Sequence, residues 1–436
     1  MSELADQVVW SAVERRLAGV EAYIPDAPPW APSTVTRVRS DGPRFVTTRP
    51  IVRPRRRVPL RLAWALIAAV LTLLVGLLIA GALREPDAVD ADWGPLGTLR
   101  QGDGAARAAL LPDGRVIVVS GEWVGMGNPR ARADVWDPQH GFEIIDAPTI
   151  PRVDPTTTLL ADGRRVLVVG GYGRTFAYPS SAIASAEIWD LDTETFQTTG
   201  AMSVARVGHT ATVLLDGRVL IAGGAGPDGG AVGAEVFDPG TGDFHPAGRL
   251  AQARTGHAAT LLLDGRVLIA GGSDPTTGLG VATVEVWDPA TAQSTPVMTL
   301  LDAPDSVELT RLPTGSVLMT GAAVLPGGMR GALLWDPRVA GTQLLEMGQA
   351  RSGHSATLLS DGRVLVIGGR TSNGPLVSSV EIWDPRDGAF HDAFPAARGV
   401  ADHTAVLLAD GQVLVVPATS GPTTGPPFLY QPGIVR

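Results

Sequence analysis

The sequence predicts an all-β protein: a seven-bladed β-propeller, preceded by one transmembrane helix and a short cytoplasmic segment. Two observations carry this prediction. Seven copies of one phrase recur with a period near fifty residues, and 22 consecutive residues, 62–83, carry no charge. The composition agrees, because 53 Gly and 35 Pro among 436 residues favour turns and short strands over helices.

The N-terminal segment, residues 1–58, is expected to lie in the cytoplasm. Val9, Val13 and Leu17 recur at helical spacing and predict one short amphipathic helix over residues 3–20. The residues that follow, up to the membrane, are rich in proline and poor in apolar clusters, so they are expected to form a flexible linker.

A transmembrane helix is predicted over residues 59–83, followed by a linker over 84–90. Residues 1–61 contain eleven Arg and six acidic residues, whereas the remainder contains 24 Arg and 38 acidic residues. Arg-rich flanks stay in the cytoplasm, so a single-pass protein of the cell membrane is expected, with residues 91–436 outside the cell. The alternative is a signal peptide cleaved near Ala80-Gly81-Ala82, but a 61-residue leader is long for such a peptide.

Each repeat reads as four antiparallel strands. An apolar run, an Asp-Gly turn and a Val/Leu/Ile run ending in Gly-Gly predict a hairpin. A third strand carries one aromatic residue, and a short fourth strand follows. The turn positions are Asp113, Asp162, Asp216, Asp264, Thr314, Asp361 and Asp410. The aromatic residues are Trp136, Trp189, Phe237, Trp287, Trp335, Trp383 and Tyr430.

The repeat resembles the kelch repeat, particularly its bacterial, galactose-oxidase-like form. The resemblance rests on Arg, Gly-His, an apolar run, Asp-Gly-x-Val-Leu-Val-x-Gly-Gly and Glu-Val-Trp-Asp-Pro, and it covers roughly residues 91–436. The seventh repeat has only three strands, so a segment from Trp93 to Leu99 is expected to supply the fourth and close the ring. Galactose oxidase depends on a Cys–Tyr cross-link and copper; this chain has no Cys, so that activity is not carried over.

Arg and His residues that open the first strands are the candidate binding residues. In kelch proteins the first strand is innermost, so the resemblance places these residues around one mouth of the central channel, where guanidinium groups bind acidic ligands. The candidates are Arg152, Arg206, Arg254, Arg351, Arg398, His209, His257, His354 and His403.

A structural interpretation of the same residues stays open. Third strands carry Glu187, Glu235, Glu285 and Glu381, which are possible ion-pair partners. The fifth repeat lacks Arg, His and Glu together and has Pro304, Val307 and Leu333 instead. Joint loss within one repeat indicates that these residues pair with each other.

No cofactor, metal or catalytic residue is predicted. Without Cys the chain has no disulfide, thiolate zinc site or cysteine nucleophile. Histidines on separate blades are not expected to converge on one metal ion. The Asp-rich turns lack the spacing of a calcium loop, and the acidic domain does not favour nucleic acid.

The leading functional hypothesis is therefore a membrane-anchored binding module that recognises a protein or a carbohydrate outside the cell. The loops after Gly-Gly differ most between repeats and are a second place for recognition. One alternative is a transmembrane signalling regulator, similar in layout to anti-sigma factors, with the propeller as its sensor. An extracellular enzyme is the third hypothesis, and the chain is expected not to be an enzyme.

Overall fold

The computed structural model describes residues 99, 106–124, 128–173, 181–230, 232–300, 303, 306–325, 329–339, 341–371, 374–418 and 425–433, with the backbone alone at 122–124, 128–129, 322–325 and 329–330. Contacts divide the chain into two units, residues 1–85 and 86–436. The predicted cytoplasmic segment 1–58, transmembrane helix 59–83 and linker 84–90 lie outside the described residues. Within these described ranges, no helix has the length and apolar character needed to cross a membrane.

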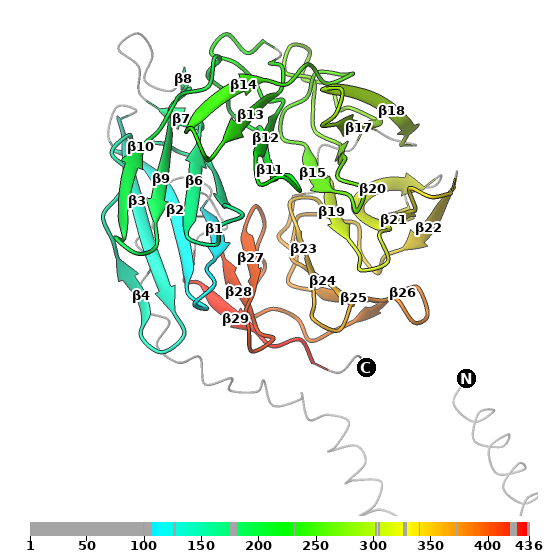
Figure 1. The fold of residues 1–436 in the computed structure, drawn as a ribbon. Coiled ribbons are helices and arrows are strands. Elements are labelled where there is room, and N and C mark those ends of the chain that lie inside the picture. The colour runs from blue at the N-terminus through cyan, green and yellow to red at the C-terminus, as the bar shows by residue number, and fades with distance from the viewer. Residues whose placement is uncertain are drawn as a thin grey trace, which may run out of the picture. The chain divides into compact units, whose positions relative to one another are not determined.

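Seven sheets form a ring, which confirms the predicted seven-bladed propeller (Figure 1). Blade 1 contains β1 (Arg107–Leu110), β2 (Val116–Val124), β3 (Asn128–Asp137) and β4 (Gly141–Ile144). Blade 2 contains β5 (Thr156–Leu159), β6 (Arg165–Val169), β9 (Ala186–Asp190) and β10 (Thr195–Thr198), with a small hairpin of β7 (Tyr172–Gly173) and β8 (Ser181–Ala182). Blade 3 contains β11 (Thr210–Val213), β12 (Val219–Ala222), β13 (Glu235–Asp238) and β14 (Asp243–Pro246).

The remaining four blades continue the same order. Blade 4 contains β15 (Ala258–Leu261), β16 (Val267–Ala270), β17 (Thr283–Asp288) and β18 (Gln293–Thr299). Blade 5 contains β19 (Glu308–Arg311), β20 (Val317–Leu325), β21 (Met329–Trp335) and β22 (Thr342–Glu346). Blade 6 contains β23 (Ser355–Leu358), β24 (Val364–Ile367), β25 (Val380–Asp384) and β26 (Ala389–Asp392). Blade 7 contains β27 (Thr404–Leu407), β28 (Val413–Val416) and β29 (Phe428–Tyr430).

The Asp-Gly turns form the predicted hairpins. In blade 3, Leu214 N–H donates to the Arg218 carbonyl at 2.8 Å, and Gly217 adopts φ 85°, which a residue with a side chain rarely tolerates. The Asp216 carboxylate accepts hydrogen bonds from the N–H and Nε of Arg218 at 3.1 and 2.8 Å. The turn therefore carries its own charge pair, and β11 and β12 pair in register from Thr210↔Ala222 onward.

The hydrophobic core is divided among the seven junctions between neighbouring blades. The second strand of a blade, such as β12, is buried along its whole length because its sheet has another sheet on each face. Each junction also buries the third-strand aromatic residue of the following blade. Trp287 of blade 4, for example, packs against blade 3 and donates from Nε1 to the Ala247 carbonyl at 3.0 Å. These layers explain why every repeat needs one large aromatic side chain.

The ring closes between blades 7 and 1. Leu99 lies in the cluster that joins Val116 of blade 1 to Leu414 of blade 7, and Thr404 Oγ1 donates to the Ala106 carbonyl at 3.2 Å. Leu99 stands fourteen residues before its turn, as Leu300 does at the junction of blades 4 and 5. Leu99 thus holds, at the junction of blades 7 and 1, the position that Leu300 holds at the junction of blades 4 and 5. The rest of the predicted closing segment, 93–98, lies outside the described residues.

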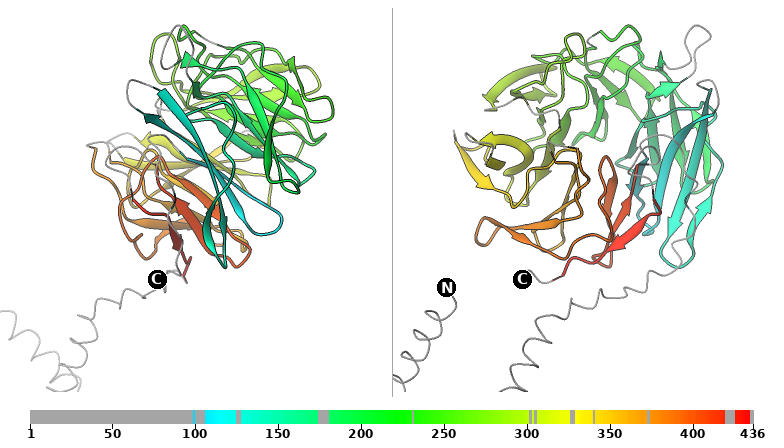
Figure 2. Two further views of the ribbon diagram at one scale, coloured as in Figure 1. Left: turned by 90° about the vertical axis from the view of Figure 1, so that its left-hand side faces the viewer. Right: turned by 180° about the vertical axis from the view of Figure 1, so that it is seen from behind.

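The two ends of the strands give the ring two different faces. The turn face carries the Asp-Gly turns. The loop face carries the loops that follow the second strands, together with the starts of the innermost strands, which surround the centre in Figures 1 and 2. Blades 1 and 5 extend farthest on the loop face, because β2 and β20 have nine residues whereas β12, β16, β24 and β28 have four.

Candidate functional site

Four of the predicted arginines lie just before the innermost strands of blades 2, 3, 4 and 6, and all four are buried. Each forms an ion pair with the predicted glutamate on the third strand of its own blade. Arg152 Nη2 lies 2.8 Å from Glu187 Oε2, and Arg254 Nη2 lies 2.6 Å from Glu285 Oε1. The other two pairs are Arg206–Glu235 and Arg351–Glu381. This arrangement agrees with the structural interpretation of these residues.

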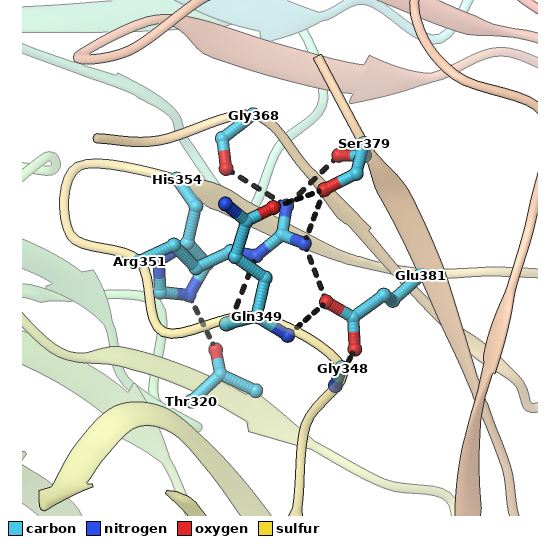
Figure 3. Close-up of polar contacts among 8 residues, drawn as sticks. All are labelled: Thr320, Gly348, Gln349, Arg351, His354, Gly368, Ser379 and Glu381. Carbon is cyan, nitrogen blue, oxygen red and sulfur yellow. Dashed lines mark hydrogen bonds and ion pairs between the residues drawn. The ribbon is translucent and has the colours of Figure 1, made fainter. Parts of the chain in front are cut away.

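Each pair also fixes the chain that enters the blade, and we call the whole arrangement a clasp. In blade 6 the guanidinium of Arg351 donates from Nη1 to the carbonyls of Gly368 and Ser379, both at 2.9 Å (Figure 3). The carboxylate of Glu381 accepts the N–H groups of Gly348 and Gln349 at 2.6 and 3.1 Å. Because residues 348 and 349 link blade 5 to blade 6, the clasp sets where that link crosses.

Burial lowers the pKa of Arg152, and the adjacent Glu187 raises it in part; the guanidinium stays charged and donates from both Nη1 and Nη2. A buried ion pair of this kind is not indispensable, since well-packed apolar residues can replace it. In blade 5, Leu333 holds the position of the clasp glutamate and packs in the cluster between blades 4 and 5, together with Val307 at the histidine position. Pro304, at the arginine position, lies outside the described residues. The joint loss seen in the sequence therefore replaces all three polar residues with apolar ones.

Arg398 differs from the other four arginines. It stands twelve residues before its turn instead of ten, and Val400 occupies the position of the clasp arginine. Val400 packs with Phe428, which occupies the position of the clasp glutamate. The Arg398 guanidinium lies over the Phe428 ring, 5.6 Å from its centroid, and donates to the Pro426 carbonyl. Blade 7 is thus a second blade with an apolar clasp.

The four predicted histidines join neighbouring blades on the loop face. Nε2 of His209, His257 and His403 lies 3.1, 3.0 and 2.8 Å from a hydroxyl group at the start of the preceding innermost strand. Nε2 of His354 lies 2.7 Å from the Thr320 hydroxyl (Figure 3). Burial and neighbouring arginines lower the pKa of His209 and His354 to about 3, so these imidazoles are neutral at physiological pH.

Eight of the nine predicted residues therefore make two sets of contacts: Arg with carboxylate in four blades, and His with hydroxyl at four junctions. The ninth, Arg398, stacks on Phe428. Ligand binding by these residues stays a prediction. Two charged residues near the ring axis, Arg107 and Glu308, were missed. Both stand six residues before the turn of their repeat, a position at which three of the other repeats have Thr and one has Ser. A charged residue in place of this hydroxyl group was the signal that the sequence offered.

No three His, Asp or Glu side chains in the described part of the chain are grouped so that they could hold a metal ion. The four histidines lie at different junctions, and each is already hydrogen-bonded through Nε2.

Comparison with known proteins places the fold. Residues 350–393 match the Kelch motif. The chain is similar to the solved structure of a fungal alcohol oxidase of the AA5 family in complex with copper, with 18% identity and a TM-score of 0.60 over 77% of this chain and 76% of that one. It is also similar to the structure of YjhT, with 14% identity and a TM-score of 0.50 over 68% of this chain and all of that one. Curated proteins yield no match.

The prediction that the chain is not an enzyme is contradicted by the first of these structures, because that propeller belongs to an oxidase. A missing catalytic motif was too weak a reason to exclude catalysis on a fold that supports it. At 18% identity the likeness shows the fold alone, however. The copper of that oxidase does not fit the described residues, which offer no group of metal ligands, in a chain without Cys.

Seven sheets with one repeat each, the matching motif in blade 6 and the shared fold of the two solved structures all point to one assignment. The chain is a seven-bladed β-propeller whose sixth blade matches the Kelch motif.

Proposed function

We propose that the chain is a membrane-anchored binding protein whose propeller recognises a protein partner through its loop face. The observation that carries this proposal is the difference between the two faces. On the turn face, five blades present the same Asp and Arg in an ion pair within the turn, at Asp113, Asp162, Asp216, Asp264 and Asp361. Because these turns repeat the same Asp–Arg ion pair, the turn face offers few features by which one partner could be distinguished from another.

On the loop face, the described parts of the blades differ from one another. Blades 1 and 5 extend long hairpins, blade 2 adds the hairpin of β7 and β8, and blade 4 carries a loop that begins at Ser273 and exposes Leu279. Varied loops on a rigid scaffold commonly carry recognition, and kelch propellers commonly bind proteins. These features support a binding role for this face.

Leu279 and Leu215 provide a matched test, because they are 70% and 71% exposed but lie on opposite faces. A photo-crosslinking amino acid is placed at either position in the full-length protein in its own cells. We expect a discrete protein adduct from position 279 and none from position 215, read by gel shift and mass spectrometry. Equal adducts from both positions, or none from position 279, would overturn the proposal.

Anchoring and orientation rest on the uncharged segment 62–83 and on the Arg-rich residues before it. Tags are placed after Ser2 and after Arg436, and intact cells are treated with protease. We expect the first tag to be protected and the second to be cleaved. Protection of the C-terminal tag would contradict the extracellular position of the propeller.

A further inference from the structure

The first residue of each innermost strand connects neighbouring blades in most of the ring. Thr156, Thr210 and Ser355 hold this position in blades 2, 3 and 6, and each hydroxyl is hydrogen-bonded to a histidine of the following blade. Thr404 holds it in blade 7 and donates to blade 1. The side chain at this position is therefore normally part of the contact between blades.

Blade 5 departs from this rule, because Glu308 holds the position. The histidine of the next blade, His354, is hydrogen-bonded instead to the hydroxyl group of Thr320 on β20. Thr320 is fully buried. The register of β20 against β21 shifts between Thr320 and Ala323, and such bulges redirect side chains. The junction of blades 5 and 6 is thus complete without Glu308. This carboxyl group, partly exposed, has no hydrogen bond or ion pair within the described residues.

Glu308 opens β19, the innermost strand of blade 5, and so lies near the centre of the ring at its loop face (Figure 1). Desolvation raises its pKa to about 7, and the charge that opposes this rise is that of Arg107. Arg107 opens β1, the innermost strand of blade 1, which is not a neighbour of blade 5, so the two residues lie at different sides of the ring centre. Arg107 is itself paired with Asp154 of blade 2.

No other charged side chain near Glu308 offsets its charge in the described part of the chain. The strands packed against β19 are β15, β20 and β23, and their described side chains include no titratable group. His257 and His354 precede β15 and β23 and are neutral, with pKa values of about 3. Arg311 lies at the opposite end of β19, about 10 Å along the strand. A partly buried carboxylate in this position, without a partner among the described residues, is stabilised most by a cation from outside the ring.

We propose that Glu308 is the binding site for a lysine or arginine side chain that the protein partner inserts along the ring axis. This inference rests on the proposed function. Lys and Arg have long, flexible aliphatic side chains that can extend between the ends of the innermost strands to reach Glu308. The propeller contains more acidic than basic residues, so it attracts basic partners. The long hairpins of blades 1 and 5, the blades that hold Arg107 and Glu308, belong to the same face.

The test uses the full-length protein in a non-ionic detergent, titrated by calorimetry with acetyl-arginine amide. Acetyl-citrulline amide is the uncharged control ligand. Binding requires the carboxylate, so the affinity for the arginine probe should fall about tenfold from pH 8 to pH 6. Glu308→Gln and Glu308→Thr, the latter restoring the residue of other repeats, should abolish binding. Glu143→Gln, at an exposed glutamate of β4, should leave it unchanged.

Equal binding of citrulline amide, or pH-dependent binding that survives in Glu308→Gln, would overturn the assignment of Glu308. The crosslink at position 279 separates the two proposals. If Glu308→Gln binds no probe and also loses the adduct, both proposals stand. If the adduct persists at full yield, Glu308 serves a free small cation, and the partner side chain is excluded. If wild type forms no adduct, the proposed function fails, whatever the probe shows.

Discussion

Blades 2, 3, 4 and 6 hold a buried arginine and glutamate where blades 5 and 7 hold apolar residues, yet in all six the first three strands pair in the same order. In blade 6, Arg351 and Glu381 bind each other and the entering chain. In blade 7, Val400 and Phe428 pack in the corresponding places. The comparison teaches that the ionic clasp is not needed for a blade to form. The ionic clasp fixes the path of the chain that enters the blade. A blade without this clasp can carry other residues at its loop-face end, as blade 5 carries Glu308.

The largest effect is expected from breaking one clasp. Arg254→Ala leaves a buried carboxylate without its cation, and Glu285→Ala leaves the reverse, so each should lower the free energy of unfolding by about 3–5 kcal/mol. The double variant Arg254→Val with Glu285→Phe copies blade 7 and should lose much less. Denaturant titration of the three variants measures this. A double variant as unstable as the sum of the singles would show that the two residues act independently.

The closing junction is expected to be as sensitive as an internal one. Leu99→Ala and Leu300→Ala each remove a buried side chain, 5% and 4% exposed, from the same position of two different junctions. Both should lower the free energy of unfolding by about 2–5 kcal/mol, because large-to-small changes leave a cavity. Thermal unfolding of both variants compares them directly. A negligible loss for Leu99→Ala alone would mean that blades 7 and 1 are held together in another way.

Acid should destabilise the junctions that contain histidine. The pKa of His257 is about 3 in the folded protein and 6.5 when unperturbed, so below pH 6.5 the unfolded state binds more protons. Stability then falls with falling pH by about 1.4 kcal/mol per unit for each such histidine. Thr210→Ala with His257→Val copies Ala258 and Val307 of the next junction. Between pH 6.5 and pH 5 this variant should lose about 2 kcal/mol less than wild type in denaturant titrations. Parallel losses would contradict the role of His257.

The smallest effect is expected on the turn face. Arg266 pairs with Asp264 at 2.7 Å, but both side chains are 40% or more exposed to solvent. Arg266→Ala should therefore change the free energy of unfolding by less than about 1 kcal/mol, and added salt should reduce even this difference. The same denaturant titration, at low and high salt, measures it. A loss comparable to that of Arg254→Ala would remove the distinction between buried and exposed pairs.

The sequence was sufficient for the repeat, because Asp-Gly turns, apolar runs and one aromatic residue per unit are local signals. It also indicated the Arg–Glu pairs, since Pro304, Val307 and Leu333 replace them together. The sequence did not reveal that Arg398 stacks on Phe428. Arg398 stands two residues before the position of the clasp arginines, and Val400 occupies that position instead.

Glu308 differs visibly from the Thr or Ser of four other repeats, but its release from the contact between blades could not be predicted, for a different reason. Its release from the contact between blades depends on Thr320, a residue of the neighbouring strand, which reaches His354 in its place. Because Thr320 lies on a different strand from Glu308, the repeat pattern of the sequence does not show that Thr320 has become the partner of His354. Only the folded structure shows this contact.

Proteins commonly begin to unfold by fraying at their termini, where few contacts hold the chain. Here the first described residue, Leu99, lies inside an apolar layer next to the blade that ends with β29. Blades 7 and 1 therefore cannot separate without opening an apolar layer that both share. We expect amide hydrogen exchange to report this as similar protection in β2, β12 and β28, early and late in the chain, in place of a gradient that declines toward its ends.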